Sequence, residues 1–334
     1  MNLLILGGTV FLGRHLTEAA LARGHHVTLF NRGRHNPELF PETERIRGDR
    51  WEDLGLLAGR FWDGVIDTSG HVPRMVHASG ERLAAAVQHY TFISSVLAYR
   101  DFPKAQGLSE HSPVTTSVDP TAQHPTPQTL GPLKALCEQE LQGLLPGRLL
   151  IVRAGFLFGP HDPTGRSIYW VQRVAQGGEV LVPGKRDRPV QLIDVRDLAE
   201  WILKSIEHRM TGVYNATGPS YPSSLSLERL LQVCKAQSRS DARLTWVDDQ
   251  FLLKAGVKPV EFPFWMPGAH GGGEIDSNKA IDAGLGFRPI EETVRHILSR
   301  NATGQSFTPL RIGIARNRED GLLQAWHAQS VPVG

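Results

Sequence analysis

The stretch that decides the fold is Leu3-Leu4-Ile5-Leu6-Gly7-Gly8-Thr9-Val10-Phe11-Leu12-Gly13-Arg14. Four consecutive apolar residues lead into two glycines and then a helical pattern, which predicts a buried parallel strand, a tight turn and a helix start. In such a turn the backbone passes close to a pyrophosphate, and the free N–H groups and dipole at the helix N-terminus attract its charge. The predicted dinucleotide contacts are Gly7, Thr9, Val10, Phe11, Leu12 and Gly13.

The spacing of this turn is Gly7-x-x-Val10-x-x-Gly13, so a side chain stands at the middle position, where a third glycine is usual. The sequence disfavours a phosphate loop of the nucleotidase kind, because Arg14-His15 stands where that loop needs Lys-Ser/Thr. A glycine pattern alone also occurs in turns that bind nothing. The interpretation therefore depends on the features that follow.

Bulk composition bounds the class of protein. The chain has 334 residues, long enough for a doubly wound domain and a smaller second one, and a formal net charge of +2. A net charge this close to zero does not indicate a basic surface that binds nucleic acid. The two cysteines, Cys137 and Cys234, lack metal or redox spacing and fit a reducing compartment. The first residues enter a strand, and no apolar run is long enough for a membrane helix. We expect a cytoplasmic protein with no metal site and no nucleic-acid or membrane partner.

The end of the second predicted strand, Val27–Phe30, bears on cofactor choice. An acidic residue there would accept hydrogen bonds from a ribose 2′-hydroxyl, but the sequence continues Asn31-Arg32-Gly33-Arg34. Arginine offers a bidentate fork to a 2′-phosphate. We therefore predict contacts from Asn31 and Arg32 and a preference for NADP(H) over NAD(H). The alternative is that the arginines form a solvated loop.

Further cofactor contacts are predicted at the ends of later strands. The third strand ends in Ile46–Arg50, where Asp49 could accept from an adenine amino group or cap the residues that follow. The segment 64–70 is a short strand that ends in small polar residues, and a helix over 73–87 leads to the strand Tyr90–Ile93. The predicted contacts from these segments are Asp49, Arg50, Thr68, Ser69, Gly70 and Ser94.

Several motifs in this order resemble the extended short-chain dehydrogenase/reductases, specifically the NAD-dependent epimerase/dehydratase group. They are Gly-Gly-Thr-x-Phe-Leu-Gly at 7–13, Ile-Ser-Ser at 93–95, Gly-Pro-Leu-Lys-Ala at 131–135, Arg-x-Gly-x-x-Phe-Gly-Pro at 153–160, and Asp-Val-Arg-Asp-Leu-Ala at 194–199. The resemblance covers roughly residues 1–220 well and the remainder loosely. It implies an oxidoreductase, epimerase or dehydratase that acts on a small hydroxyl or carbonyl compound, nucleotide-sugar-like in the broadest sense.

The resemblance also implies an active site with one member missing. In that family a Ser or Thr after the fifth strand and a Tyr-x-x-x-Lys pair act on the substrate, and the lysine lowers the tyrosine pKa and holds the nicotinamide ribose. Here Ser95 and Lys134 match the serine and the lysine, whereas Leu130 stands at the tyrosine position. Leucine cannot transfer a proton. Another acid could act instead, with Tyr99, His124 or a bound water as candidates, the protein could bind a dinucleotide without turnover, or the alignment of the pair could be displaced.

The second half contributes two predicted substrate residues. Arg188, ahead of Pro189-Val190-Gln191, could meet a substrate phosphate or carboxylate, or form a surface ion pair. Trp265 belongs to the aromatic loop Phe262–Pro267, which could line a pocket or lie in the core. A terminal amphipathic helix is expected to pack on the body or on another subunit.

Together these features predict an α/β fold with a Rossmann-type doubly wound parallel sheet and a smaller C-terminal α/β substrate lobe. The expected Rossmann domain is 1–155 plus about 190–218, and the lobe is about 156–189 plus 219–334 with the terminal helix. Besides the enzyme, two functions stay open. The protein could be a catalytically silent dinucleotide-binding sensor or scaffold, or an RNA-binding protein of the same fold, since some plant members of this wider group resemble RNA-binding proteins. The expected partners are a small-molecule substrate and a second copy in a homodimer.

Overall fold

The computed structural model describes residues 1–220, 223–268, 273–302 and 312–330. Its centre is a parallel sheet of seven strands in the order β11-β6-β5-β4-β1-β2-β3. The strands are β1 (Asn2–Leu6), β2 (His26–Asn31), β3 (Glu44–Arg47), β4 (Trp62–Asp67), β5 (Val87–Ser95), β6 (Leu149–Ala154) and β11 (Gly212–Ala216). The order reverses between β1 and β4, which is the switch point of a doubly wound sheet. The predicted fold class is confirmed.

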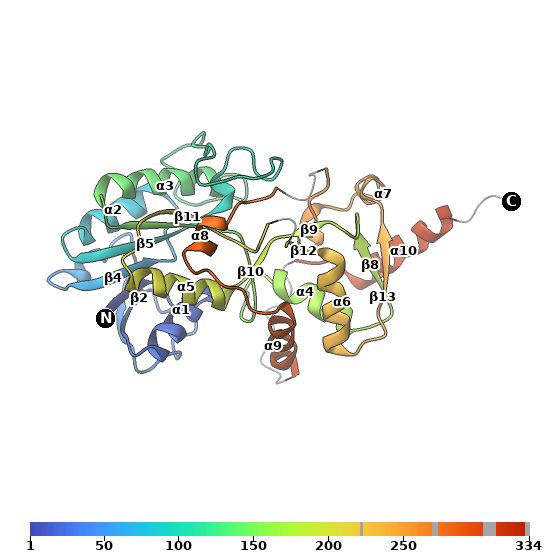
Figure 1. Cartoon of the computed structure of the whole chain (residues 1–334), viewed down its shortest axis with the longest axis horizontal. Coiled ribbons are helices and arrows are strands. Elements are labelled where there is room, and N and C mark those ends of the chain that lie inside the picture. The colour runs from blue at the N-terminus through green and yellow to red at the C-terminus, as the bar shows by residue number, and fades with distance from the viewer. Residues whose placement is uncertain (221–222, 269–272, 303–311, 331–334) are drawn as a thin grey trace.

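Helices cover both faces of this sheet (Figure 1). On one face α1 (Phe11–Ala22) lies beside α5 (Val195–Glu207), and on the other α2 (Pro73–Leu83) lies beside α3 (Leu130–Leu144). Strand β1 is buried from Leu3 to Leu6 between the two layers, which explains its uninterrupted apolar run.

The smaller lobe lies beside the sheet along the long axis of the molecule (Figure 1). It pairs β8 (Glu179–Pro183) with β13 (Arg243–Val247) and packs one apolar core in which the Trp170 indole stacks on Phe262. Its helices are α4 (Arg166–Ala175), α6 (Leu227–Ser238), α7 (Asp249–Lys254), α9 (Ile290–Ala302) and α10 (Arg316–Ser330). A short helix, α8 (Asn278–Asp282), packs instead against β11 of the large sheet.

Two small strand pairs lie between the sheet and this lobe. In one, β7 (Phe156–Phe158) runs parallel to β10 (Leu192–Asp194), and in the other β9 (Pro189–Val190) pairs with β12 (Leu225–Ser226). The predicted strand over 190–193 is thus divided at Gln191. The chain passes from the sheet into the lobe and back through these segments.

The expected helix over 73–87 was too long. Helix α2 ends at Leu83, the three alanines 84–86 form a turn, and Val87 already belongs to β5. Alanine continues a helical pattern without marking its end, so the boundary at Leu83 could not be predicted.

The terminal helix α10 packs on the body of the lobe, one of the two arrangements expected. Glu319 in its first turn is buried, pairs with Arg173 of α4 at 2.7 Å and accepts the Leu181 N–H at 2.9 Å. Burial raises the pKa of Glu319 to about 7. The helix is therefore held by a desolvated carboxylate as well as by apolar contacts from Leu322 and Leu323.

Candidate dinucleotide and substrate site

The turn between β1 and α1 has the geometry of an anion cradle. A side chain on Gly7, whose φ is +120°, would lie 2.4 Å from the Thr68 hydroxyl, and one on Gly13 would lie 2.8 Å from the Gly8 nitrogen. The first N–H groups of α1 have no intrahelical partner, and no side chain caps them. A dinucleotide pyrophosphate fits the open, uncapped N-terminus that these residues form.

Val10 shows why the middle position of the turn tolerates a side chain. It precedes α1 in extended conformation, with φ −126° and ψ 133°, and its side chain is exposed. Any residue adopts this conformation, so a third glycine is not needed there.

Two asparagines stabilise the turn, Asn31 from the end of β2 and Asn36 from the loop after it. Asn31 donates its amide to the Gly7 carbonyl at 2.7 Å and accepts from the Gly33 N–H at 2.9 Å. Asn36 donates to the Thr9 carbonyl at 2.8 Å. The side chain of Asn31 therefore supports the cradle, and Asn36 is a supporting residue that the sequence analysis did not single out. An asparagine in a loop after a strand was the available signal.

Arg32 is an accessible cation in the loop after β2. Half of its side chain is exposed, and its guanidinium lies 3.8 Å from the Asp49 carboxylate. Asp49 itself accepts the Trp51 N–H at 3.0 Å, as in the capping alternative. The guanidinium of Arg32 is therefore exposed and only loosely paired.

Arg50 lies deeper, in a buried polar cluster under the strand ends. Its two terminal nitrogens bind Asp67 at 2.7 and 2.8 Å and the hydroxyls of Ser69 and Ser79. Burial opposes the charge of Asp67, but the Arg50 guanidinium outweighs it and lowers the pKa of Asp67 below its ordinary value. Because these nitrogens are engaged, Arg50 supports the strand ends, while its Nε is buried without a hydrogen-bond partner.

Thr68, Ser69 and Gly70 follow β4 at the carboxyl edge of the sheet. The hydroxyls of Thr68 and Ser69 donate to the Leu6 carbonyl at the end of β1, at 2.9 and 3.1 Å. The Gly70 carbonyl accepts from Lys134. These residues join the edge of β4 to the glycine turn on one side and to α3 on the other.

Lys134 is brought to the same edge by the docking of α3. A side chain on Gly131 would lie 2.0 Å from the Leu97 carbonyl, so the helix begins in close contact with the short helix η2 (Val96–Ala98). The Lys134 ammonium donates to the carbonyls of Gly70 at 2.6 Å and Ile93 at 2.5 Å. Its burial lowers the pKa of Lys134 to about 8.

Ser95 and Leu130 occupy the two remaining positions of the implied active site. Ser95 is half-buried and caps η2 by accepting the Leu97 N–H at 3.2 Å, which leaves its own O–H to donate. Leu130 begins α3 and is also half-buried, one helical turn from Lys134. The helix thus sets residues 130 and 134 on one face, as the expected pair requires.

Tyr99 and Ser94 both bind buried partners. The Tyr99 hydroxyl donates to the Asn215 amide oxygen at 2.7 Å, and burial raises the pKa of Tyr99 above its ordinary value. Ser94 donates to Glu138, which forms a buried ion pair with Arg153 at 2.6 Å. The hydroxyl of Tyr99 therefore joins the end of η2 to β11, which disfavours it as the substitute acid.

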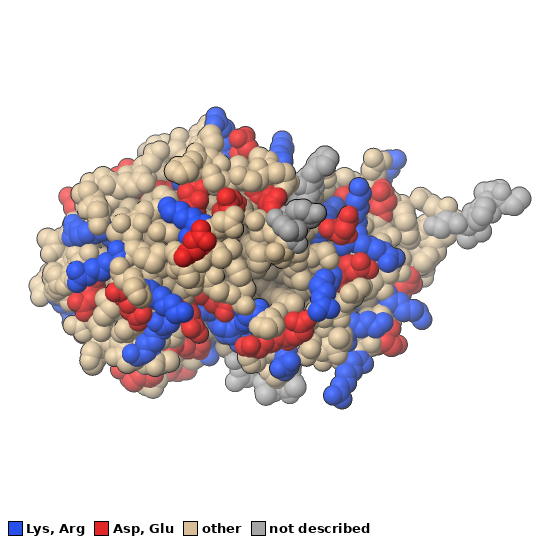
Figure 2. Space-filling model, in the orientation of Figure 1, with Lys and Arg blue, Asp and Glu red and all other residues tan. Residues whose placement is uncertain are grey.

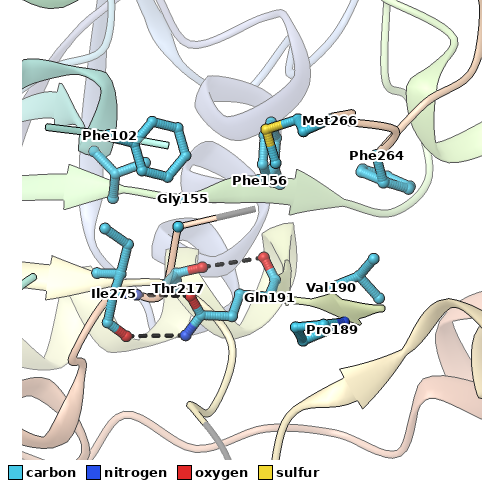
Figure 3. Close-up of a pocket in the computed structure, with 12 residues that line it drawn as sticks. Phe102, Gly155, Phe156, Pro189, Val190, Gln191, Thr217, Phe264, Met266 and Ile275 are labelled. Carbon is cyan, nitrogen blue, oxygen red and sulfur yellow. Dashed lines mark hydrogen bonds between the residues drawn. The ribbon is translucent and has the colours of Figure 1, made fainter. Parts of the chain in front are cut away.

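The two predicted substrate residues, Arg188 and Trp265, meet at one carboxylate. Asp249 of α7 binds the Arg188 guanidinium and the Trp265 indole N–H, each at 2.7 Å, and both side chains are buried. Their chain neighbours Val190, Phe264 and Met266 line a pocket between the sheet and the lobe (Figure 3). Neither Arg188 nor Trp265 is among the described residues that line this pocket, and their role toward a substrate stays a prediction.

Residues 71–217 match the model of the NAD dependent epimerase/dehydratase family. This region is therefore similar to that family, and the predicted resemblance is confirmed for it. The whole chain also shares the fold of solved epimerases and dehydratases. UDP-glucose 4-epimerase of Thermotoga maritima, solved with UDP-glucose, superposes with a TM-score of 0.68 at 16% identity, over 92% of this chain and 100% of that one. The dTDP-glucose 4,6-dehydratase of Bacillus anthracis, solved with NAD, gives 0.67 at 13% identity, over 93% and 100%.

One curated relative is named for stem-loop binding and not for epimerase or dehydratase activity. The chloroplast stem-loop binding protein of 41 kDa b from Arabidopsis thaliana is 25% identical over 253 residues, or 70% of this chain. The match spans 62% of that relative's length.

Within the part of the chain that the structure describes, no helix is long and apolar enough to cross a membrane. No group of three or more His, Cys, Asp or Glu side chains there could hold a metal ion.

Proposed function

We propose that this protein is a dinucleotide-dependent oxidoreductase of the epimerase/dehydratase type that prefers NADP(H) and acts on a small hydroxyl or carbonyl compound. The observation that carries the proposal is the uncapped N-terminus of α1 at the glycine turn, on the same sheet edge as Lys134. The Thermotoga structure holds a nucleotide sugar and the Bacillus structure holds NAD, which supports this class of cofactor and substrate.

Each residue of the site has a role in this proposal. The N–H groups from Val10 to Gly13 bind the pyrophosphate, and Arg32 binds the 2′-phosphate. Lys134 holds the nicotinamide ribose, and Ser95 donates a hydrogen bond to the substrate oxygen. When bound, the nicotinamide supplies the hydride acceptor or donor.

The proton that a tyrosine would carry needs another source. The Tyr99 hydroxyl is engaged by Asn215, and His124 lies exposed on the long connection between η2 and α3. We propose that a water held by Ser95 relays the proton, since the Ser95 hydroxyl can both donate and accept a hydrogen bond.

A catalytically silent dinucleotide-binding protein is the second candidate. It is favoured by Leu130, which cannot transfer a proton, together with the engaged hydroxyl of Tyr99. The variant Leu130→Tyr separates the two functions, because it restores the missing group on the face of α3 that carries Lys134. We expect hydride transfer from NADPH to a panel of carbonyl compounds to rise. An unchanged rate would favour the silent protein.

An RNA-binding protein of the same fold is the third candidate, favoured by the name of the Arabidopsis relative. Against it, the face drawn in Figure 2 shows lysines and arginines interspersed with acidic residues rather than gathered in one basic patch. Retention on single-stranded RNA that falls steeply with salt would support this candidate.

The proposal is tested first by thermal unfolding in concentration series of NADP(H) and NAD(H). A ligand that binds only the folded state, at one hundred times its dissociation constant, adds about 2.7 kcal/mol to the free energy of unfolding. We expect both to stabilise and NADP(H) to do so at lower concentration. Stabilisation by neither would refute the proposal. Light scattering on the same samples tests the expected homodimer, and a cytoplasmic location stays a prediction.

A further inference from the structure

An exposed arginine on the edge strand β3 lies beside the end of β2. Strand β3 is the last strand of the large sheet on the side of β2, and its register pairs Arg47 with Asn31. Directly paired residues of neighbouring strands have their side chains on the same face of the sheet. Asn31 ends β2, where a doubly wound sheet recognises the 2′ position of the adenine ribose. Arg47 therefore lies next to that position.

The side chain of Arg47 reaches the loop that carries Arg32. A Cβ atom on Gly33, whose φ is +68°, would lie 3.3 Å from the Arg47 Nε and 3.7 Å from its guanidinium carbon. Because glycine has no side chain, the guanidinium can approach the backbone of the loop closely. Gly33 directly follows Arg32 in the chain. The two arginines thus belong to one small region of the surface after β2.

The guanidinium of Arg47 is available for an anion. Arg47 is exposed, and among the residues that the structure describes no ion pair or hydrogen bond engages its side chain. Glu44, the acidic residue of the same strand, accepts from Arg60 at 2.6 Å and from Thr28 at 3.0 Å. The hydrogen bond from Arg60 lowers the pKa of Glu44. The alternation of side chains along a strand also places Glu44 and Arg47 on opposite faces.

The loop after β2 carries more positive than negative charge. Asp49 lies 3.8 Å from the Arg32 guanidinium and also accepts the Trp51 N–H at 3.0 Å. Arg34 is a further exposed cation of the same loop. Guanidinium groups gathered around one carboxylate repel each other, and a bound anion with two charges would relieve this repulsion. A phosphate monoester has nearly this charge at neutral pH.

We propose that Arg47 and Arg32 together bind the 2′-phosphate of NADP(H), and that Arg47 is a specificity-determining residue for this cofactor. The inference rests on the proposed function and adds a residue to it. Arg47 offers two parallel N–H donors with no carboxylate in competition, which is the geometry that a phosphate prefers. NAD(H) has a hydroxyl at this position and leaves both arginines without a counter-charge, so the pair separates the two cofactors.

The experiment compares NADP⁺ and NAD⁺ on the full chain by calorimetric titration. In Arg47→Gln we expect NADP⁺ affinity to fall by about tenfold and NAD⁺ affinity to stay unchanged. Arg47→Lys keeps the charge but loses the fork, and its loss of affinity should lie between the two. An unchanged NADP⁺ affinity in Arg47→Gln would overturn the proposal. Equal losses for both cofactors would do the same, since they would show that Arg47 only supports the loop.

The matched control removes one arginine from the other end of the same strand. Arg60→Gln takes the cation from Glu44, the first residue of β3, and should leave NADP⁺ affinity unchanged. A loss equal to that in Arg47→Gln would reduce the effect to general charge and overturn the proposal. The double variant Arg32→Ala/Arg47→Gln should bind NADP⁺ and NAD⁺ alike. A preference for NADP⁺ that remained there would assign the 2′-phosphate to another group.

Titration with adenosine 2′,5′-bisphosphate and 5′-AMP keeps this inference distinct from the proposed function. The two probes differ only in the 2′-phosphate, and we expect the bisphosphate to bind about tenfold more tightly in the wild type and equally in the double variant. If the bisphosphate behaves so while NADP(H) does not bind, the proposed function fails and the arginine site stands. If NADP(H) binds and Arg47→Gln changes neither titration, the arginine site alone is wrong.

Discussion

The two halves of the candidate site are made from different parts of the polypeptide. The proposed dinucleotide cradle is one continuous turn in which backbone N–H groups would bind the ligand. Its glycines are required because a side chain at Gly7 or Gly13 would clash with its neighbours. The inter-lobe pocket is made of side chains from segments more than 100 residues apart, such as Val96 and Phe264. Changes in the cradle should therefore affect any dinucleotide alike, whereas changes in the pocket should alter which substrate is accepted.

The largest expected effect concerns the buried cluster beneath the cradle. Asp67→Asn leaves the Arg50 guanidinium buried without its counter-charge, and we expect a loss of about 3–5 kcal/mol in the free energy of unfolding. Urea unfolding followed by circular dichroism measures it. Glu228→Gln, which breaks the exposed pair with Arg186, is the control and should cost less than about 1 kcal/mol. Similar losses in both variants would contradict a special role for the cluster.

The cradle itself is tested by a matched pair of glycine substitutions in helices. Gly13→Ala puts a methyl group 2.8 Å from the Gly8 nitrogen, where only backbone can give way. We expect NADP(H) and NAD(H) affinity to fall by about a hundredfold, equal to about 2.7 kcal/mol. Gly143→Ala in α3 meets nothing within 4 Å and should leave affinity unchanged. Retained affinity in Gly13→Ala would place the dinucleotide elsewhere.

Arg32→Ala removes a proposed cofactor contact that lies outside the cradle. Because the guanidinium is exposed and lies 3.8 Å from Asp49, its loss should leave the turn intact. We expect NADP(H) affinity to fall by about tenfold, the value of one charge-assisted contact, with NAD(H) affinity nearly unchanged. Calorimetric titration of both cofactors measures the difference. Equal losses for both would refute the 2′-phosphate assignment.

The cradle could be predicted from the sequence because its signals are local. The run Leu3–Leu6, the glycines and the helical pattern are adjacent, and each predicts its own backbone conformation without help from distant residues. The depth of Arg50 could not be predicted, because it depends on Asp67 and Ser79, which reach it only through the order of the strands. The pocket was missed for the same reason, although the loop 262–267 was marked as a possible lining.

The charge of Lys134 should have a smaller effect on dinucleotide affinity, and this effect should depend on pH. Burial lowers its pKa from 10.5 to about 8, so the ammonium loses its charge as the pH rises through that value. The charged form attracts an anionic dinucleotide, and affinity should therefore fall between about pH 7 and pH 9, by up to about tenfold. Lys134→Met should bind more weakly at pH 7 and lose this dependence. Arg32→Ala should keep it, because arginine stays charged throughout the range. A pH dependence that survives in Lys134→Met would show that another group at the sheet edge titrates, and the lysine would then be a structural clamp for the Gly70 and Ile93 carbonyls.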